Sequence, residues 1–461
     1  MAAPPAAKKG AGGLASLPEE VLLIVFSRLR IKDLFLLAVT STWWLRLFTD
    51  DPAFLRAAQG HGARLLGFFF QQTSFIRCPK MRQDHMMQRA SAFAPTFFPT
   101  PGSHPLLGPT DRALTYFVSD ADGAFNYATP LASRHGIVLM RLVPRSPDMA
   151  AFFTPVVFGL CNPVTSERHV TPLLEGVTWP ELFLGGYAIV TAADSSLDLD
   201  DICSSRRHVF TQLIVTSYDR EGLQWLVYSY DAATRRWTTL TACLHRDEHE
   251  VPFRLEGANA AVVHRGAAHW LYTDQNLSTC PPTSMYTLRA EVGGAGATPR
   301  VSMTKLPLTA GESPFLYANR DGRLSVASLY GMCVEVWTQQ QQDGGGGGDH
   351  ASPWLRTRLI RIPIEVPSAH PYAMVSQREW FEFNGGAMLV LFDGGAVFLL
   401  DLEKKKKVEK LMDLPPRLFS NERCKMVVPY EMDLSEFFAF QLGSLFARWN
   451  KQHVDLDVGK A

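Results

Sequence analysis

The sequence predicts an α+β multidomain protein: a small N-terminal three-helix module, a large all-β domain expected to be a kelch-like β-propeller, and a C-terminal helix. Three observations carry this prediction, namely an apolar run after a helix-start signal, many short strand-like runs, and a final amphipathic stretch. With 461 residues, the chain exceeds the usual length of one domain. We expect a disordered tail at 1–15, the helical module at 16–59, a linker at 60–109, the β domain at 110–432, and the C-terminal helix and tail at 433–461.

The helical module begins with a capping-box spacing, in which Ser16 is followed three residues later by Glu19. The first helix should cover about 18–29, and its residues 21–26 are all apolar. Such a run surrounds the helix, so every side of the helix needs cover. A module of about 40 residues is too small to bury everything it offers. Part of this surface should therefore contact another body, as exposed apolar patches usually do.

Further helical stretches follow in the same module. Asp33 is a plausible N-cap for a helix over 34–39, and two more stretches cover about 41–49 and 52–55.

Five segments of the module resemble an F-box in order and spacing: 17–22, 27–29, 32–34, 40–44 and 51–55. The resemblance implies a three-helix unit that docks on a Skp-type adaptor and, through it, on a cullin ubiquitin ligase. The residues that it places at or beneath that interface are Leu17, Pro18, Ile24, Leu29, Leu34 and Trp44. The sequence departs from the family pattern at three places. Ile24 stands where an acidic residue is common, Arg30 where Pro is usual, and Ser41-Thr42 where Cys-Lys is common.

From about residue 110, short runs rich in β-branched and aromatic residues alternate with Gly, Pro, Asn and Asp, which predicts an all-β domain. About 320 residues is too long for one sandwich but fits a propeller of six or seven blades at about 40–50 residues each. The runs expected to form strands are 136–142, 154–159, 185–190, 209–217, 223–230, 260–264, 269–272, 324–329, 334–337, 388–392 and 396–402.

Segments of this region also resemble the F-box-associated β domains of plant F-box proteins, particularly those of grasses. The similar segments are 161–165, 227–231, 321–324, 334–337 and 429–433. Their physical meaning is structural: Asn162-Pro163 favours a turn, Asp321-Gly322 a hairpin turn, and Trp337 at a strand end fills space between sheets.

The C-terminal stretch reads as an amphipathic helix capped by Asp433. We expect its apolar face to pack on the β domain, and a partner-binding helix is the alternative. That face contains Leu434, Phe437, Phe438, Leu442, Leu445, Phe446 and Trp449.

The amino-acid composition limits which cellular compartments and which binding partners are expected for this chain. Lys+Arg and Asp+Glu are both 45, and this balance argues against a nucleic-acid-binding protein. The seven cysteines show no C-x-x-C spacing, which favours a reducing compartment over a disulfide framework or a zinc finger. We see neither a signal peptide nor an apolar run long enough to span a membrane. Cytoplasm or nucleus is therefore expected, with no cofactor, metal or membrane partner.

Several short motifs match catalytic or ligand-binding signatures but lie outside the secondary structure that those signatures need. Residues 245–249 fit the inverted zinc-protease spacing H-x-x-E-H, but they lie in a charged stretch between strand-like runs. Gly344–348 lacks the strand, helix and Lys-Ser of a phosphate loop. Lys404–407 and the histidines 264 and 269 are expected at turns. We therefore expect a non-catalytic adaptor that recruits a protein substrate. The alternatives are a propeller enzyme or carbohydrate-binding protein with a helical cap, and a ligase-independent scaffold.

Overall fold

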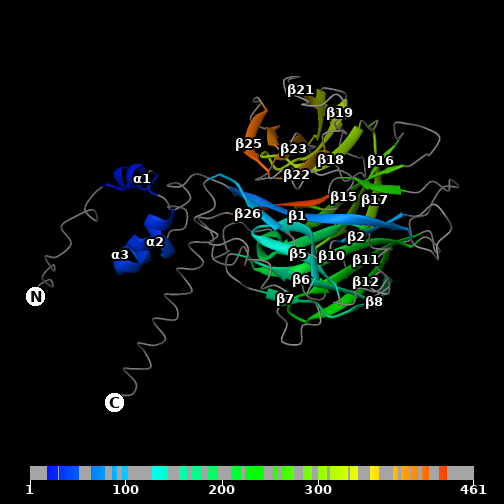
Figure 1. The fold of residues 1–461 in the computed structure, drawn as a ribbon, viewed down its shortest axis with the longest axis horizontal. Helices are drawn as coiled ribbons and strands as arrows, with labels where there is room; N and C mark the ends of the chain where they lie inside the picture. The colour runs from blue at the N-terminus through cyan, green and yellow to red at the C-terminus, as the bar shows by residue number, and fades with distance from the viewer. Residues whose placement is uncertain are drawn as a thin grey trace, which may run out of the picture. The chain divides into compact units, whose positions relative to one another are not determined.

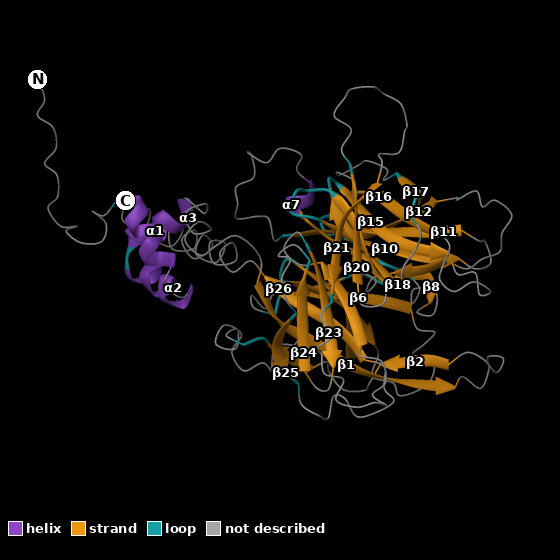
Figure 2. Ribbon diagram, turned by 90° about the horizontal axis from the view of Figure 1, so that it is seen from above, coloured by secondary structure: helices purple, strands orange, loops and turns teal. Residues whose placement is uncertain are grey.

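In a computed structural model, the chain forms two compact units, one with the N-terminal helices and the other with the strands (Figure 2). The residues that the structure describes are 18–27, 29, 31–50, 64–77, 86–90, 96–101, 127–143, 155–163, 168–178, 185–195, 209–219, 224–242, 253–256, 261–274, 284–292, 300–308, 312–330, 333–340, 354–362, 377–382, 386–393, 396–402, 408–414 and 425–432.

The helical unit contains α1 (Glu19–Ser27), α2 (Ile31–Thr40) and α3 (Thr42–Asp50), which confirms the three predicted helices. α3 follows directly on Ser41, whose carbonyl oxygen accepts a 3.0 Å hydrogen bond from the Leu45 amide. Asp33 does not cap α2, because the helix already begins at Ile31; it lies instead in the first turn, where an acidic side chain favours the helix dipole. The stretch expected over 52–55 lies outside the described residues.

A small apolar core joins the three helices. It contains Leu22 and Phe26 from α1, Leu34 and Ala38 from α2, and Trp44 from α3, all of them buried. The rings of Phe26 and Trp44 meet edge to face with centroids 5.1 Å apart, a geometry that aromatic pairs prefer. Each helix is too short to be stable alone, so this shared core is what holds the unit together.

The strands form six sheets arranged as a six-bladed β-propeller (Figure 1). Blade 1 contains β1 (Arg64–Arg77), β2 (Met86–Ala90), β3 (Thr96–Pro99) and β26 (Lys425–Met432). Blade 2 contains β4 (Tyr127–Arg134), β5 (Ile137–Val143), β6 (Pro155–Cys161), β7 (Arg168–Val170) and β8 (Leu174–Thr178). Blade 3 contains β9 (Tyr187–Thr191), β10 (Phe210–Asp219), β11 (Gln224–Asp231) and β12 (Arg236–Ala242), and the short helix α7 (Ala192–Ser195) follows β9.

The remaining blades continue in chain order. Blade 4 contains β13 (Phe253–Glu256), β14 (Val262–His264), β15 (Ala267–Asp274), β16 (Met285–Glu291) and β17 (Val301–Leu306). Blade 5 contains β18 (Glu312–Ala318), β19 (Leu324–Tyr330), β20 (Cys333–Gln339) and β21 (Trp354–Arg361). Blade 6 contains β22 (Gln377–Glu382), β23 (Ala387–Asp393), β24 (Ala396–Asp401) and β25 (Glu409–Asp413). Each of the eleven runs expected from the sequence overlaps a strand.

The ring is closed by strands from the two ends of the β domain. In Figure 1 the red strand β26 lies beside the blue strand β1, and the two are hydrogen-bonded neighbours in blade 1. The linker expected over 60–109 is wrong for this reason: β1, β2 and β3 lie inside it, and the compact unit begins at Leu65. The run of residues 65–70, LLGFFF, is apolar because β1 is covered on both faces, a pattern without the alternation of a half-exposed strand.

Apolar clusters lie at five junctions between successive blades, and a hydrogen bond is described at the sixth. Phe158 and Tyr228 join blades 2 and 3, and Trp225 and Trp270 join blades 3 and 4. Further clusters join blades 4 and 5, blades 5 and 6, and blades 6 and 1. Between blades 1 and 2, the Tyr430 hydroxyl donates to the Gly136 carbonyl at 3.2 Å. Each blade face is therefore covered by its neighbour, which is how a propeller buries both faces of a sheet.

Tryptophans supply specific contacts across these junctions. Trp237 Nε1 donates to the Pro172 carbonyl between blades 3 and 2 at 2.9 Å. Trp380 Nε1 donates to the Ser313 carbonyl between blades 6 and 5 at 2.8 Å. A Cβ added at Gly186 would lie 2.2 Å from Cδ1 of Trp270, so blades 3 and 4 approach through a position that needs glycine. The predicted Asp321-Gly322 hairpin turn lies between β18 and β19, with Gly322 at φ 66°.

The predicted C-terminal helix with its apolar face, together with residues 245–249, 344–348 and 404–407, lies outside the described residues. Among the described helices, none is both long and apolar enough to cross a membrane.

Candidate functional site

The first candidate site is an exposed apolar surface on the helical unit. Four large apolar side chains there remain open to solvent: Val21 is 40% exposed, Ile24 57%, Leu36 51% and Trp43 41%. They come from all three helices, so the small core leaves apolar positions uncovered on each of them. This agrees with the expectation that so short a module cannot bury all its apolar side chains. We name these four residues the helical apolar surface.

The residues predicted for adaptor binding divide between surface and core. Pro18 and Ile24 are exposed, and Leu29 is half-buried. Leu34 and Trp44 are core residues, only 1% and 8% exposed, so they support the helices from beneath. Leu17 lies outside the described residues, as does Arg30, one of the departures from the family pattern.

Sequence reasoning missed three members of the helical apolar surface: Val21, Leu36 and Trp43. The adjacent tryptophans on α3 contained the signal, because neighbouring positions on a helix point about 100° apart and cannot both face one core. Trp44 packs on Phe26, which leaves Trp43 at the surface with its ring 4.3 Å from that of Trp44.

The second candidate site is a polar cluster where the innermost strands of the propeller end. Among the innermost strands, β26 lies next to β4, β4 next to β9, β9 next to β14, β14 next to β18, and β18 next to β22. Arg134 ends β4, Glu382 ends β22, and Glu431 is the penultimate residue of β26. Asp194 follows β9 in α7. These four residues converge because the innermost strands deliver them to the same end of the ring.

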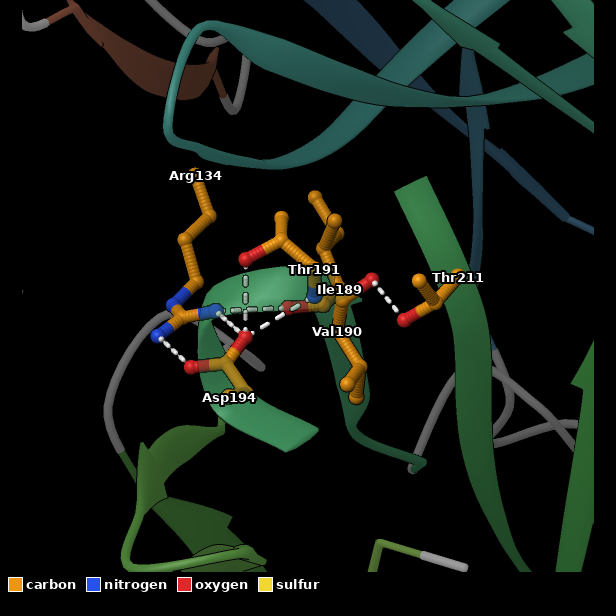
Figure 3. Close-up of polar contacts among 6 residues, drawn as sticks. All are labelled: Arg134, Ile189, Val190, Thr191, Asp194 and Thr211. Carbon is orange, nitrogen blue, oxygen red and sulfur yellow. Dashed lines mark hydrogen bonds and ion pairs between the residues drawn. The ribbon is translucent and has the colours of Figure 1, made fainter. Parts of the chain in front are cut away.

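Arg134 and Asp194 form a bidentate ion pair between blades 2 and 3 (Figure 3). Arg134 Nη1 lies 2.6 Å from Asp194 Oδ2, and Nη2 lies 2.8 Å from Oδ1. Arg134 Nη1 also donates to the Ile189 carbonyl at 3.0 Å. The Thr191 amide and hydroxyl donate to Asp194 Oδ2 at 2.8 and 3.0 Å. Each group is thus held by several partners, as buried charges require.

The electrostatics of this pair follow from burial and mutual attraction. Burial by itself would raise the pKa of Asp194, but the nearby Arg134 guanidinium outweighs it and holds that pKa below its usual range. For Arg134, burial opposes the charged form, while Asp194, and then Glu382 and Glu431, raise its pKa. Both members stay charged near neutral pH, so neither suits proton transfer.

Glu382 behaves differently within the same cluster. Burial raises its pKa to about 7, although Arg134 and a 3.4 Å hydrogen bond from the Ala318 amide act against the rise. Its carboxyl therefore titrates near neutral pH. Because the bond from Ala318 comes from blade 5, Glu382 also links the ends of β18 and β22.

Other residues with catalytic or ligand chemistry are placed as core or turn residues. His269 is buried in β15, where burial and Arg289 lower its pKa to about 4, and His264 ends β14 beside the turn. Burial raises the pKa of the Cys161 thiol, which disfavours the reactive thiolate. Within the described part of the chain, no group of three His, Cys, Asp or Glu residues could hold a metal ion.

Comparison with known proteins finds one family match, in the region of the helical unit. Residues 14–56 match the F-box-like family model. No curated protein matches the chain. The chain thus carries an F-box-like region at its N-terminus, followed by a six-bladed β-propeller.

Similar solved structures share little sequence with this chain. The β-propeller domain of the Trilobed protease from Pyrococcus furiosus is 10% identical with a TM-score of 0.32, covering 66% of this chain and 95% of that one. A protein from Lactobacillus plantarum is 10% identical with a TM-score of 0.34, covering 76% and 82%. An acylaminoacyl peptidase from Pyrococcus horikoshii is 9% identical with a TM-score of 0.31, covering 63% and 46%.

Proposed function

We propose that this chain is the substrate-recognition subunit of a Skp–cullin–F-box ubiquitin ligase. In this proposal the N-terminal helices bind a Skp-type adaptor, which links them to a cullin, and the propeller binds a protein substrate. The observation that carries the proposal is the F-box-like match at 14–56 on a unit whose helices leave large apolar side chains exposed. Several exposed large apolar side chains on one small unit are typical of a protein that binds a partner there.

The proposed mechanism is proximity, and no side chain of this subunit takes part in bond chemistry. A substrate held by the propeller is confined near the conjugating enzyme on the same ligase, which raises the effective concentration of its lysines. The propeller suits this role because its blades are locked by junction clusters and hydrogen bonds, so a bound substrate keeps a defined position.

The adaptor contact should rest on the helical apolar surface, with Leu34 and Trp44 supporting it from the core. Ile24 is the most exposed of the four residues, at 57%. More than half of its side chain is therefore left to bury against a partner, and burial of apolar area is the main favourable term in association. A charge at Ile24 should oppose binding while the helices stay folded.

The test is a pull-down of the purified full-length chain with a Skp-type adaptor, comparing wild type with Ile24→Asp. We expect binding to weaken by at least about tenfold, because a desolvated carboxylate replaces a buried apolar contact. The matched control is Leu359→Asp on β21, which puts the same charge on a 60% exposed leucine of the propeller. It should leave adaptor binding unchanged.

Two outcomes would contradict the proposal. In one, the wild-type chain binds no Skp-type adaptor. In the other, Ile24→Asp and Leu359→Asp weaken adaptor binding equally. Circular dichroism of Ile24→Asp is the folding control. A charge at the core residue Leu34, by contrast, would unfold the helices and so cannot report on the interface.

Finer points of the proposal rest on sequence resemblance and composition. The likeness to F-box-associated domains of grasses, the kelch-like character of the blades, and a location in cytoplasm or nucleus stay predictions. The departures at Ser41 and Thr42 stand at the start of α3, and together with Arg30 they keep open the alternative of a scaffold that does not bind the adaptor.

One observation favours the alternative of a propeller enzyme or carbohydrate-binding protein. Carboxylates converge where the innermost strands end, and Glu382 among them has a pKa raised to about 7 by burial. A general acid or base needs such a value. Binding of the full-length chain to a glycan array, lost in Glu382→Gln, would support this alternative, and an array without signal would count against it.

A further inference from the structure

The outer edge of blade 5 is formed by β21, an eight-residue strand that pairs with β20 on one side. Among the described strands, none pairs with its other side. The outer strands of blades 3, 4 and 6 are shorter, with seven, six and five residues. An unpaired strand edge presents a row of amide and carbonyl groups that can accept another strand.

Two leucines on this edge are unusually open to solvent. Leu355 is 53% exposed and Leu359 is 60% exposed. The register places Leu359 opposite Glu335, and Leu355 opposite the buried Thr338, so the two leucines lie on opposite faces of the blade. Proteins usually protect an exposed edge from association with charged positions, and β21 has three arginines of this kind. It differs from a fully protected edge in keeping an exposed apolar side chain on each face.

The charge of this edge has one sign. β21 carries Arg356, Arg358 and Arg361 and has no acidic residue. On the neighbouring strand β20, Glu335 offsets part of this charge, with its Oε1 3.2 Å from Arg356 Nη1. Arg358 Nη1 donates to the Leu402 carbonyl of blade 6 at 2.8 Å. On the described strands β20 and β21 taken together, three arginines stand against one carboxylate, so this pair of strands is basic.

We propose that β21 is a docking edge for an extended acidic segment of a partner protein, which adds to blade 5 as a further strand. The inference rests on the proposed function and deepens it, because it names the class of substrate segment that the propeller takes. Main-chain hydrogen bonds to the open edge supply affinity, as in other cases of strand addition. Side chains on the two faces supply specificity.

The side chains of β21 determine which residues the partner's segment needs. Opposite charges on neighbouring strands stabilise a pair of strands, so the segment needs Asp or Glu beside the arginines. Apolar side chains beside Leu355 and Leu359 would cover the exposed leucines on each face. A second copy of this chain is a poor occupant, because pairing of two β21 edges brings arginines against arginines.

The experiment measures binding of a short fluorescein-labelled peptide to the full-length chain by fluorescence anisotropy. The peptide repeats Leu-Leu-Glu-Glu, because successive side chains of a strand alternate between its faces and this repeat therefore puts leucine and glutamate on both. We expect saturable binding that weakens as salt is raised, since exposed charge pairs are screened. Arg356→Gln combined with Arg361→Gln should weaken binding by about tenfold. The same peptide methylated on every backbone amide should not bind, because it has no amide N–H left to donate along either edge of a strand.

Matched controls are available on other outer strands. Lys305→Gln removes a cation from β17 of blade 4, and it should leave peptide binding unchanged. A peptide with lysine in place of glutamate should not bind. The inference is overturned if the acidic peptide does not bind, if the methylated peptide binds equally well, or if Lys305→Gln weakens binding as much as the double variant.

The outcome is separable from that of the proposed function. The peptide assay needs no adaptor, and the adaptor pull-down needs no peptide. If the chain binds the adaptor but not the peptide, only the proposal of a docking edge is refuted. If it binds the peptide but not the adaptor, the proposed ligase role is refuted while the docking edge is supported.

Discussion

Replacement of Asp194 by Asn should destabilise the propeller more than any comparable change of an ion pair at its surface. Four donor contacts end on the Asp194 carboxylate: two from Arg134 and two from Thr191. An asparagine keeps one acceptor oxygen and turns an amino group toward one of these donors. Arg134 then stays 18% exposed without its charge partner.

The expected loss is about 3–5 kcal/mol in the free energy of unfolding, the range for breaking a buried pair by removal of one partner. The control is the more open pair between Glu335 and Arg356, with a distance of 3.2 Å and side chains that are 19% and 55% exposed. Glu335→Gln should cost less than about 1 kcal/mol. Urea unfolding followed by tryptophan fluorescence measures both, since Trp225 and Trp270 are buried at blade junctions.

The pH dependence gives an independent check of the same reasoning. The pKa of Asp194 is lowered in the folded chain, so its contribution to stability is present above the unfolded value and is lost as pH falls through the folded value. The difference between wild type and Asp194→Asn should therefore shrink in acid. A loss in Asp194→Asn no larger than that in Glu335→Gln would refute the claim that this ion pair holds blades 2 and 3 together.

Three further changes test other contacts of the propeller by urea unfolding. Gly186→Ala should cost about 1–3 kcal/mol, because the added Cβ would lie 2.2 Å from Trp270 Cδ1 and must displace that ring; an unchanged midpoint would contradict this. Tyr430→Phe should cost about 1–2 kcal/mol through loss of the hydroxyl contacts to Gly136 and Asn162 that join blades 1 and 2, with the ring contacts kept. Because the pKa of Glu382 is raised in the folded chain, its contribution to stability is complete below the unfolded pKa and is lost as pH rises through about 7. Above pH 7, Glu382→Gln should therefore be more stable than wild type by up to about 3 kcal/mol. A stability difference between the two that does not widen from acid to alkaline pH would contradict this.

Local patterns in the sequence were enough to predict the three N-terminal helices, many of the strands and the propeller. Helix starts and strand-like runs depend on neighbours a few residues apart, and these can be read directly from the chain. The same patterns misassigned residues 60–109 as a linker. β1 has no alternation because both its faces are covered, and its partner β26 lies at the opposite end of the domain. No local pattern links two strands so far apart.

The candidate site divides in the same way. The sequence by itself determined that residues 14–56 are F-box-like, that the module is too small to bury its apolar side chains, and that a large β domain follows. Only the tertiary structure decided that Ile24 is exposed while Leu34 and Trp44 are core, and that Arg134, Asp194 and Glu382 meet at one end of the ring. It also decided which strand stays unpaired at the edge of blade 5. Burial, ion pairing and open edges depend on which distant segments become neighbours, and ring closure brings those segments together.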